Sequence, residues 1–237
     1  RDRPGGPDAS TAHPARVGLF VRGARGGRSA YNPGMSRDAS RFVSRAGEKL
    51  DAALEAFRLD VSGLVCADFG CNVGGFTDCL LRRGAAKVYA VDTGYGALAW
   101  RLRRDERVAV LERTNALHAD PPEPVALITI DVAWTPQERI VTGALRWLGP
   151  GGRIVSLLKP HYELAKLDRP EDAGRGASGG HRAKRAALSD AEAEAVCRTV
   201  CERLSILDVR VLAAMRSGLR GKGGNVEFLL LIEPAAE

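Results

Sequence analysis

A glycine-rich turn between an apolar strand and a helix constrains this chain most strongly. The segment Leu64–Ala67 is apolar, Asp68 follows it, and Gly70, Gly74 and Gly75 interrupt the next stretch. Glycine is needed where a backbone turns tightly or approaches a ligand closely. The pattern predicts a strand, a tight turn and a helix, which is how doubly wound α/β sheets build a ligand site. The alternative is a structural turn that binds no ligand.

A second acidic strand end follows about one crossover later. Residues 88–91 read as an apolar strand that ends at Asp92, and an acid in this place typically hydrogen-bonds ribose hydroxyls. The dinucleotide fingerprint G-x-G-x-x-G fails, because Gly70 is followed by three residues other than glycine before Gly74. Asp68 beside the turn suits a cationic or polyhydroxylated ligand better than a pyrophosphate. These features favour S-adenosylmethionine (AdoMet) over NAD.

Composition limits the class of protein. The 237 residues are enough for one α/β domain with a sizeable core. The net charge of +6 weakly favours polyanionic partners. The five cysteines show no paired framework and predict reduced thiols in a cytoplasmic protein. The histidines are scattered, so no metal site is predicted. No apolar run is long enough to span a bilayer, so no membrane insertion is predicted.

The chain divides near residue 40. Residues 1–40 are rich in Arg, Gly, Pro and Ala without apolar periodicity, which predicts a disordered basic tail. Met35 is the first methionine, so residues 1–34 are interpreted as upstream, non-native sequence. The competing interpretations are an RNA-contacting arm and the end of an N-terminal domain. Residues 41–237 form the predicted catalytic domain.

Within that domain, apolar strand patterns alternate with helical ones. A polar loop is predicted over 166–188, and helices are predicted over 47–57, 75–83, 95–104, 136–147 and 189–204, the last capped by Ser189. Strands are predicted over 64–69, 87–92, 107–111, 125–131, 153–158, 205–213 and 226–232. The expected fold is a Rossmann-like, doubly wound, mostly parallel seven-stranded α/β sheet. Its last strand is antiparallel, because the final connection is too short for a crossover helix.

Charged residues stand at several predicted strand ends. Asp131 and Lys159 each end a strand, Glu227 begins the last one, and Lys49 lies on the first helix. Ligands bind at this edge of open α/β sheets. Methyl transfer to a hydroxyl requires removal of its proton, and a lysine can accept a proton only when neutral. The cluster therefore predicts either a catalytic site or an ion-pair network at the sheet edge.

Six short motifs occur in one order along the chain: Ser44–Leu50, Asp68–Cys79, Val91–Gly96, Leu111–Ala116, Lys159–Glu163 and Gly223–Leu229. Over about residues 41–233 this series resembles the TlyA family, often labelled haemolysin A, within the FtsJ-like RNA 2′-O-methyltransferases. The resemblance implies an AdoMet-dependent methyltransferase that modifies a ribose 2′-hydroxyl of RNA, with ribosomal RNA or a ribosomal subunit as the expected partner. The oligomeric state is left open.

The resemblance also implies roles for individual residues. The family's lysine-aspartate-lysine-glutamate tetrad corresponds to Lys49, Asp131, Lys159 and Glu227. Lys159 would deprotonate or orient the hydroxyl. The implied cofactor-binding residues are Asp68, Gly70, Gly74, Gly75, Phe76 and Asp92, with Asn115 at the adenine edge. The alternative for Asn115 is an ordinary turn residue.

The chain departs from the family pattern in two respects. Residues 1–40 are too short and unpatterned for the family's usual S4 RNA-binding domain, so RNA docking would rely on the catalytic domain. After Asp131 the family tends to continue with serine and phenylalanine, whereas residues 132–135 read Val-Ala-Trp-Thr here. Trp134 would stack on an unpaired base or pack in the core. Phosphate contacts are predicted for basic residues of two loops, namely Arg182, Lys184, Arg185, Arg216, Arg220 and Lys222.

Three alternative functions remain. A non-catalytic RNA-binding or ribosome-assembly factor would have no need of both lysines and both acids. A haemolysin would be expected to have a signal or membrane segment. A small-molecule O-methyltransferase would not need basic loops.

Overall fold

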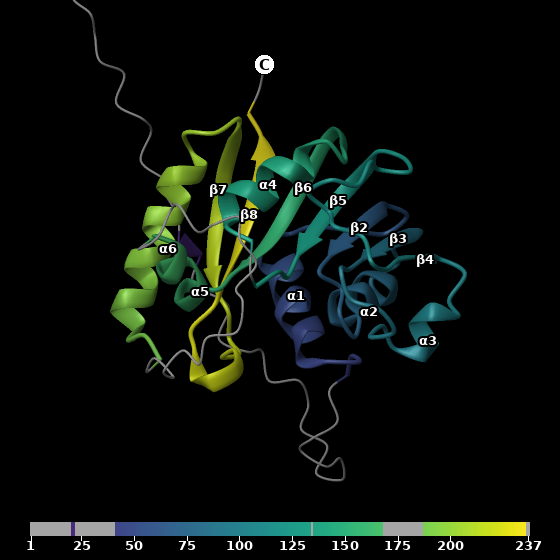
Figure 1. The fold of residues 1–237 in the computed structure, drawn as a ribbon, viewed down its shortest axis with the longest axis horizontal. Helices are drawn as coiled ribbons and strands as arrows, with labels where there is room; N and C mark the ends of the chain where they lie inside the picture. Colours follow the sequence, from purple (N-terminus) through teal and green to yellow (C-terminus); the bar gives the residue numbers. More distant parts are fainter. Residues whose placement is uncertain (1–19, 22–40, 134, 168–186, 236–237) are drawn as a thin grey trace, which may run out of the picture.

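In the described part of the chain, eight strands form one sheet with helices on both of its faces (Figure 1). The computed structural model describes residues 20–21, 41–133, 135–167 and 187–235. In chain order the strands are β1 (Phe20–Val21), β2 (Val65–Phe69), β3 (Lys87–Val91), β4 (Val108–Leu111), β5 (Val125–Ile130), β6 (Leu148–Leu158), β7 (Val209–Arg216) and β8 (Phe228–Pro234). The helices are α1 (Arg45–Ala56), α2 (Gly75–Arg82), α3 (Trp100–Arg103), α4 (Gln137–Leu145), α5 (Pro160–Leu167) and α6 (Asp190–Leu204), with a 3-10 turn η2 (Lys222–Gly224).

The strands lie side by side in the order β1-β7-β8-β6-β5-β2-β3-β4. Neighbours from β6 to β4 pair in parallel, whereas β8 runs antiparallel to both β6 and β7. Only residues 217–227 join β7 to β8, which is too short for a crossover helix. The predicted doubly wound, mostly parallel sheet with an antiparallel last strand is thus confirmed. The carboxyl ends of β2, β3, β5 and β6 meet the amino end of β8 at one edge.

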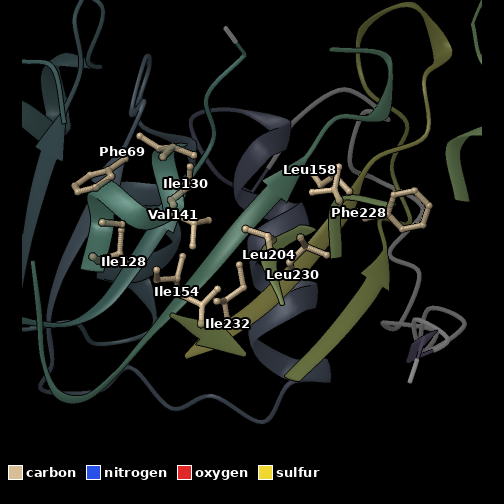
Figure 2. Close-up of a cluster of buried hydrophobic side chains, with 14 of the residues drawn as sticks. Phe69, Ile128, Ile130, Val141, Ile154, Leu158, Leu204, Phe228, Leu230 and Ile232 are labelled. Atoms are coloured by element: carbon tan, nitrogen blue, oxygen red, sulfur yellow. The ribbon is translucent and has the colours of Figure 1, made fainter. Parts of the chain in front are cut away.

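Side chains alternate between two apolar layers, as the strand period of two requires. On β8, Leu229 and Leu231 join the layer that contains α1 and α2, whereas Phe228, Leu230 and Ile232 join the layer that contains α4 and α6. Figure 2 shows side chains of the second layer, in which residues of β5, β6 and β8 lie beside Val141 of α4 and Leu204 of α6. The sheet is therefore buried on both faces, which fixes the register of its central strands.

Most predicted helices are confirmed to within a few residues. Helix α6 begins where Ser189 was expected to cap it. The Ser189 Oγ accepts the Glu192 N–H at 3.3 Å, and the Glu192 carboxylate accepts the Ser189 N–H at 2.8 Å. This reciprocal capping box satisfies backbone donors at the helix start.

Two predicted elements have different bounds. The helix expected over 95–104 is only the short α3, because Gly96 has φ 75° and the Asp92 carboxylate accepts the Gly94 N–H at 2.7 Å. Strand β6 begins at Leu148 rather than near residue 153. The register shifts between its first contact with β5 and the next, so the glycine-rich turn is taken up as an irregularity within the strand.

Helix α5, strand β1 and the 3-10 turn η2 were not predicted. Helix α5 follows β6 directly and begins at Pro160, whose fixed φ suits the first helical position. The two-residue strand β1 pairs in parallel with β7, with Phe20 opposite Ala214, although no pattern in the sequence indicates it. The rest of the segment predicted to be disordered lies outside the described residues. Strands β7 and β8 each lie two to four residues later than predicted at their starts.

Candidate active site

The turn between β2 and α2 brings three segments of backbone together. Gly70 and Gly74 have φ of 82° and 95°, in the left-handed region that glycine tolerates. A Cβ atom on Gly70 would lie 2.7 Å from the carbonyl oxygen of Asp131, and one on Gly75 would lie 2.2 Å from Oγ of Ser44. Side chains at these positions would push the turn away from the end of β5 and the start of α1.

Asp68 lies beneath this turn and is fully buried. Its Oδ2 accepts hydrogen bonds from the N–H and Oγ1 of Thr77, at 2.9 and 2.7 Å, and its Oδ1 accepts one from Oγ1 of Thr129 at 3.1 Å. Burial raises the pKa of the Asp68 carboxyl to about 7, although the bonds from Thr77 and Thr129 partly oppose this. Asp68 therefore anchors the start of α2 to the sheet, and supports the turn from below.

Asp92 lies half-buried at the end of β3 and organises the rim of the turn. Its Oδ2 accepts the Asn72 N–H at 2.9 Å, and its Oδ1 accepts the Gly94 N–H at 2.7 Å. Each carboxylate oxygen can accept more than one hydrogen bond, so both keep capacity for a hydroxyl donor. The position fits the ribose contact predicted for this residue.

A cavity of about 50 Å³ opens between the turn, the start of α1 and the end of β5. Its lining comprises Ser44, Ala46, Asp68, Gly70, Cys71, Asn72, Val73, Gly75, Phe76 and Asp131. Ligand cavities usually enclose about 300 Å³ or more, so a nucleoside ligand would also lie on the exposed rim of the turn. The close-packed glycines, the buried Asp68 carboxylate below them and the half-buried Asp92 carboxylate at the rim fit a cationic nucleoside such as AdoMet.

The four predicted catalytic residues form two ion pairs. Nζ of Lys49 lies 2.5 Å from Oε2 of Glu227, with side chains only 11% and 4% exposed. Nζ of Lys159 contacts Oδ1 of Asp131. The two pairs are neighbours because Leu158 of β6 lies opposite Phe228 of β8. In this antiparallel register, Lys159 follows Leu158 at the place where Glu227 precedes Phe228. The juxtaposition is the predicted one, and it is common to a catalytic cluster and an ion-pair network.

His161 lies next to this cluster and was not predicted as a site residue. Its Nδ1 is buried without a hydrogen-bond partner among the described residues. Burial lowers the pKa of the His161 imidazole, and the charge of Lys159 lowers it further. Ser44 and Ala46 were missed as well, although both stand in the first of the six motifs and line the cavity.

Two further predicted cofactor residues have clear surroundings. The Phe76 side chain is 2% exposed and belongs to the layer of α1 and α2, where it supports the turn from the core side. Asn115 is exposed in the loop after β4, and its Oδ1 accepts the Leu117 N–H at 3.0 Å. This bond is the turn geometry of the alternative interpretation, and it leaves the side-chain amide available for contacts.

The predicted RNA-binding residues are only partly described. Trp134, Arg182, Lys184 and Arg185 lie outside the described residues, as does the side chain of Lys222. Arg216 and Arg220 both form ion pairs with Asp190, at 2.5 and 3.0 Å. Their charges are therefore partly compensated within the protein.

Metal binding and membrane insertion find no support in the described residues. Among the described residues, no cluster of three or more His, Cys, Asp or Glu side chains is arranged to hold a metal ion. Within the same part of the chain, none of the helices has the length and apolar character needed to cross a membrane. All five cysteines are buried free thiols.

Similarity to known proteins identifies the family. The sequence profile described as FtsJ-like methyltransferase matches residues 42–232, nearly the whole of the described sheet and its helices. The chain belongs to the FtsJ-like methyltransferase family. The resemblance inferred from the six motifs is thus confirmed.

Several named proteins are similar to this FtsJ-like chain. The candidate rRNA methyltransferase YqxC of Bacillus subtilis is 37% identical over 80% of this chain and 65% of its own length. The 16S/23S rRNA (cytidine-2′-O)-methyltransferase TlyA of Mycobacterium tuberculosis is 38% identical over 80% of this chain and 67% of its own. A candidate hemolysin of Streptococcus thermophilus superposes with a TM-score of 0.70 and 32% identity, over 85% of this chain and 70% of that chain. The chain thus spans about two thirds of the length of the curated relatives.

Proposed function

We propose that this chain is an AdoMet-dependent methyltransferase that modifies ribose 2′-hydroxyls of ribosomal RNA. The observation that carries the proposal is the two lysine–carboxylate pairs, Lys49–Glu227 and Lys159–Asp131, beside a glycine turn flanked by Asp68 and Asp92. Membership of the FtsJ-like family and similarity to a protein named as an rRNA cytidine-2′-O-methyltransferase support this function.

The turn and its two acids form the proposed cofactor site. When bound, AdoMet supplies the electrophilic methyl group of its sulfonium. Asp92 accepts hydrogen bonds from ribose hydroxyls, and the glycines Gly70, Gly74 and Gly75 let the backbone approach the cofactor closely. Asp68 and Phe76 act from beneath by holding the turn in place, and Asn115 contacts the adenine edge.

The lysine–carboxylate pairs form the proposed catalytic site. Lys159 has three N–H donors when charged, so it can contact Asp131 and also orient the ribose 2′-hydroxyl. This orienting role suits a lysine held against a carboxylate better than direct proton abstraction does. Lys49 and Glu227 form the second wall of the acceptor site. Most of the acceleration would come from aligning the hydroxyl oxygen with the methyl group.

The RNA would approach over the loops at the same edge of the sheet. Trp134 is proposed to stack on an unpaired base. Arg182, Lys184, Arg185 and Lys222 are proposed to contact phosphates, which gives affinity rather than sequence selection. Arg216 and Arg220 offer a phosphate less free charge, because each is paired with Asp190. A ribosomal substrate implies a cytoplasmic location, which is part of the proposal.

The test is transfer of tritiated methyl from AdoMet to undermethylated ribosomal subunits and to tRNA, followed by nucleoside mass spectrometry. The expected product is a 2′-O-methylated nucleoside from rRNA that is absent when Lys159→Ala protein is used. AdoMet binding without incorporation into any RNA would instead favour a non-catalytic RNA-binding factor. Absence of AdoMet binding would overturn the assignment of the turn.

A further inference from the structure

We propose that Asp190 is a positioning residue that holds the β7–β8 loop, residues 217–227, over the catalytic pair of Glu227 and Lys49. Asp190 is the first residue of α6 and lies outside the cavity and the four catalytic residues. The inference deepens the proposed function and rests on it, because Glu227 is one of the proposed catalytic residues.

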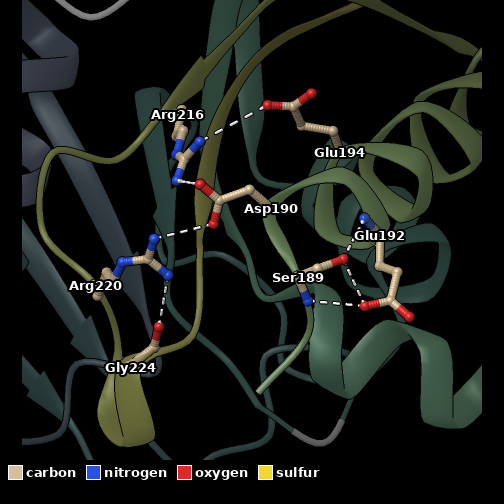
Figure 3. Close-up of polar contacts among 7 residues, drawn as sticks. All are labelled: Ser189, Asp190, Glu192, Glu194, Arg216, Arg220 and Gly224. Atoms are coloured by element: carbon tan, nitrogen blue, oxygen red, sulfur yellow. Dashed lines mark hydrogen bonds and ion pairs between the residues drawn. The ribbon is translucent and has the colours of Figure 1, made fainter. Parts of the chain in front are cut away.

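A single carboxylate bridges two arginines at this place (Figure 3). Oδ2 of Asp190 lies 2.5 Å from Nη2 of Arg216, the last residue of β7, and Oδ1 lies 3.0 Å from Nη2 of Arg220 in the loop. The Ser189–Glu192 capping box fixes the backbone of the helix start that carries Asp190. Exposed ion pairs are individually weak, but a network with fixed geometry is the exception. Asp190 therefore ties the end of β7, at Arg216, and the β7–β8 loop, at Arg220, to α6.

Arg220 also joins the loop to itself through its side chain and to α1 through its backbone carbonyl. Its Nη1 donates to the Gly224 carbonyl at 2.9 Å, while the Arg220 carbonyl accepts a bond from Nη2 of Arg45 at 3.1 Å. The Gly221 N–H donates to the Asn225 carbonyl at 2.8 Å and closes the loop. The loop is thus clamped from α6 on one side and from α1 on the other.

The clamped backbone lies directly on the catalytic carboxylate. A Cβ atom on Gly221 would lie only 2.0 Å from Oε1 of Glu227. The Ser217 N–H also donates to the Glu227 carbonyl at 2.9 Å. A small displacement of the loop would therefore change the position of the Glu227 carboxylate and its contact with Lys49. Misplacement of a catalytic group by about 1 Å can reduce a rate by about a hundredfold.

A different role for the same contacts makes the opposite prediction. If Arg216 and Arg220 served mainly to bind RNA phosphates, Asp190 would compete with the RNA for them. Loss of Asp190 would then strengthen RNA binding and leave the rate of transfer unchanged. If Asp190 positions the loop, its loss lowers the rate and leaves AdoMet affinity unchanged.

The test compares Asp190→Ala with Glu194→Gln. Glu194 lies on the same helix and approaches Arg216 only to 3.8 Å, so it controls for loss of a negative charge. For Asp190→Ala we expect kcat for methyl transfer to fall about tenfold, with KM for RNA changed less. Glu194→Gln should keep the wild-type kcat. Asp190→Glu, which keeps the carboxylate, should recover part of the rate; Asp190→Asn replaces the alanine variant if that protein does not fold.

Hydrogen–deuterium exchange supplies a readout that needs no activity. Amides of residues 217–227 should exchange faster in Asp190→Ala than in the wild type or in Glu194→Gln. Unchanged exchange, or a lower KM for RNA with an unchanged kcat, would overturn the inference. The proposed function would fail separately if the wild-type protein transferred no methyl group. Faster exchange of the loop in Asp190→Ala would then still support the contact between Asp190 and the loop.

Discussion

Nζ of Lys49 lies 2.5 Å from Oε2 of Glu227, although 178 positions separate the two residues along the chain. Both side chains are almost fully buried, so the pair is held in a place of low dielectric constant. Removing one member of a buried pair leaves the other charge uncompensated. The contact therefore links the stability of the domain to the geometry of its proposed catalytic site.

Glu227→Gln should lower the free energy of unfolding by about 3 kcal/mol, because Lys49 is left buried without a carboxylate. Urea denaturation measures the effect. Glu233→Gln is the matched control, since Glu233 lies on β8, which begins directly after Glu227, but pairs with the exposed Arg210. Its cost should stay below about 1 kcal/mol. Equal losses in the two variants would contradict the importance of the buried pair.

Lys159→Ala should reduce methyl transfer at least about a hundredfold, because the 2′-hydroxyl loses the group that orients it. Calorimetric affinity for AdoMet should be unchanged. Lys87→Ala is the control lysine, since Lys87 begins β3 and pairs with Glu123 at 2.9 Å, at the opposite end of the strand from Asp92. Undiminished turnover of Lys159→Ala would remove Lys159 from the mechanism.

Asp92→Ala should weaken AdoMet binding about tenfold or more, because it removes the ribose acceptor and the carboxylate that holds the Asn72 and Gly94 amides. Isothermal calorimetry measures this directly. Asp105→Ala serves as control, since Asp105 pairs with Arg107 at 2.7 Å before the start of β4. The same affinity in all three proteins would refute the ribose contact.

Gly221→Ala should slow methyl transfer about tenfold or more, because its Cβ would collide with the Glu227 carboxylate. Gly218→Ala tests the specificity of this effect, since nothing lies within 4 Å of a Cβ at that position in the same loop. Single-turnover kinetics with saturating AdoMet compares them. A rate for Gly221→Ala equal to that of Gly218→Ala would show that the close approach has no role.

Stability should depend on pH through Asp68. Burial raises the pKa of its carboxyl from 3.8 to about 7, so the folded state binds the proton more tightly than the unfolded state does. Linkage then requires this contribution to stability to be largest at low pH and to be lost as pH rises from 3.8 to about 7. Asp68→Asn removes the titrating group, and its amide can donate to Oγ1 of Thr129 while its oxygen accepts from Thr77. Urea denaturation across this pH range should show the wild type losing stability relative to Asp68→Asn, and a constant difference would contradict the shift.

Much of the fold could be predicted because its signals are local. The continuous apolar run of β5 indicates a strand buried on both faces, and the short β7–β8 connection excludes a parallel crossover. The helix expected over 95–104 is too long because Gly96 and the Asp92–Gly94 bond hold the preceding loop. Helix α5 was missed because its sequence, which begins at Pro160, follows a strand without any intervening turn signal.

The site could be predicted in part, for the same reason. The positions of Asp68, Asp92, Asp131 and Lys159 at strand ends follow from the order of strands along the chain, since parallel strands end at one edge. The hydrogen bonds that satisfy the buried Asp68 carboxylate do not follow from the strand order, because they come from Thr77 and from Thr129 of another strand. Nor does the link from Asp190 to the loop over Glu227, which passes through two arginine side chains.

By itself, the sequence determined the doubly wound sheet, the glycine turn and the strand ends at which the functional groups stand, because apolar period and glycine position act within a few residues. Only the tertiary structure decided which charges are paired: Lys49 with Glu227, Lys159 with Asp131, and Asp190 with both Arg216 and Arg220. Ion pairing depends on the distance between atoms in space. That distance is set by the packing of the helices against the sheet and by the pairing of strands remote in sequence.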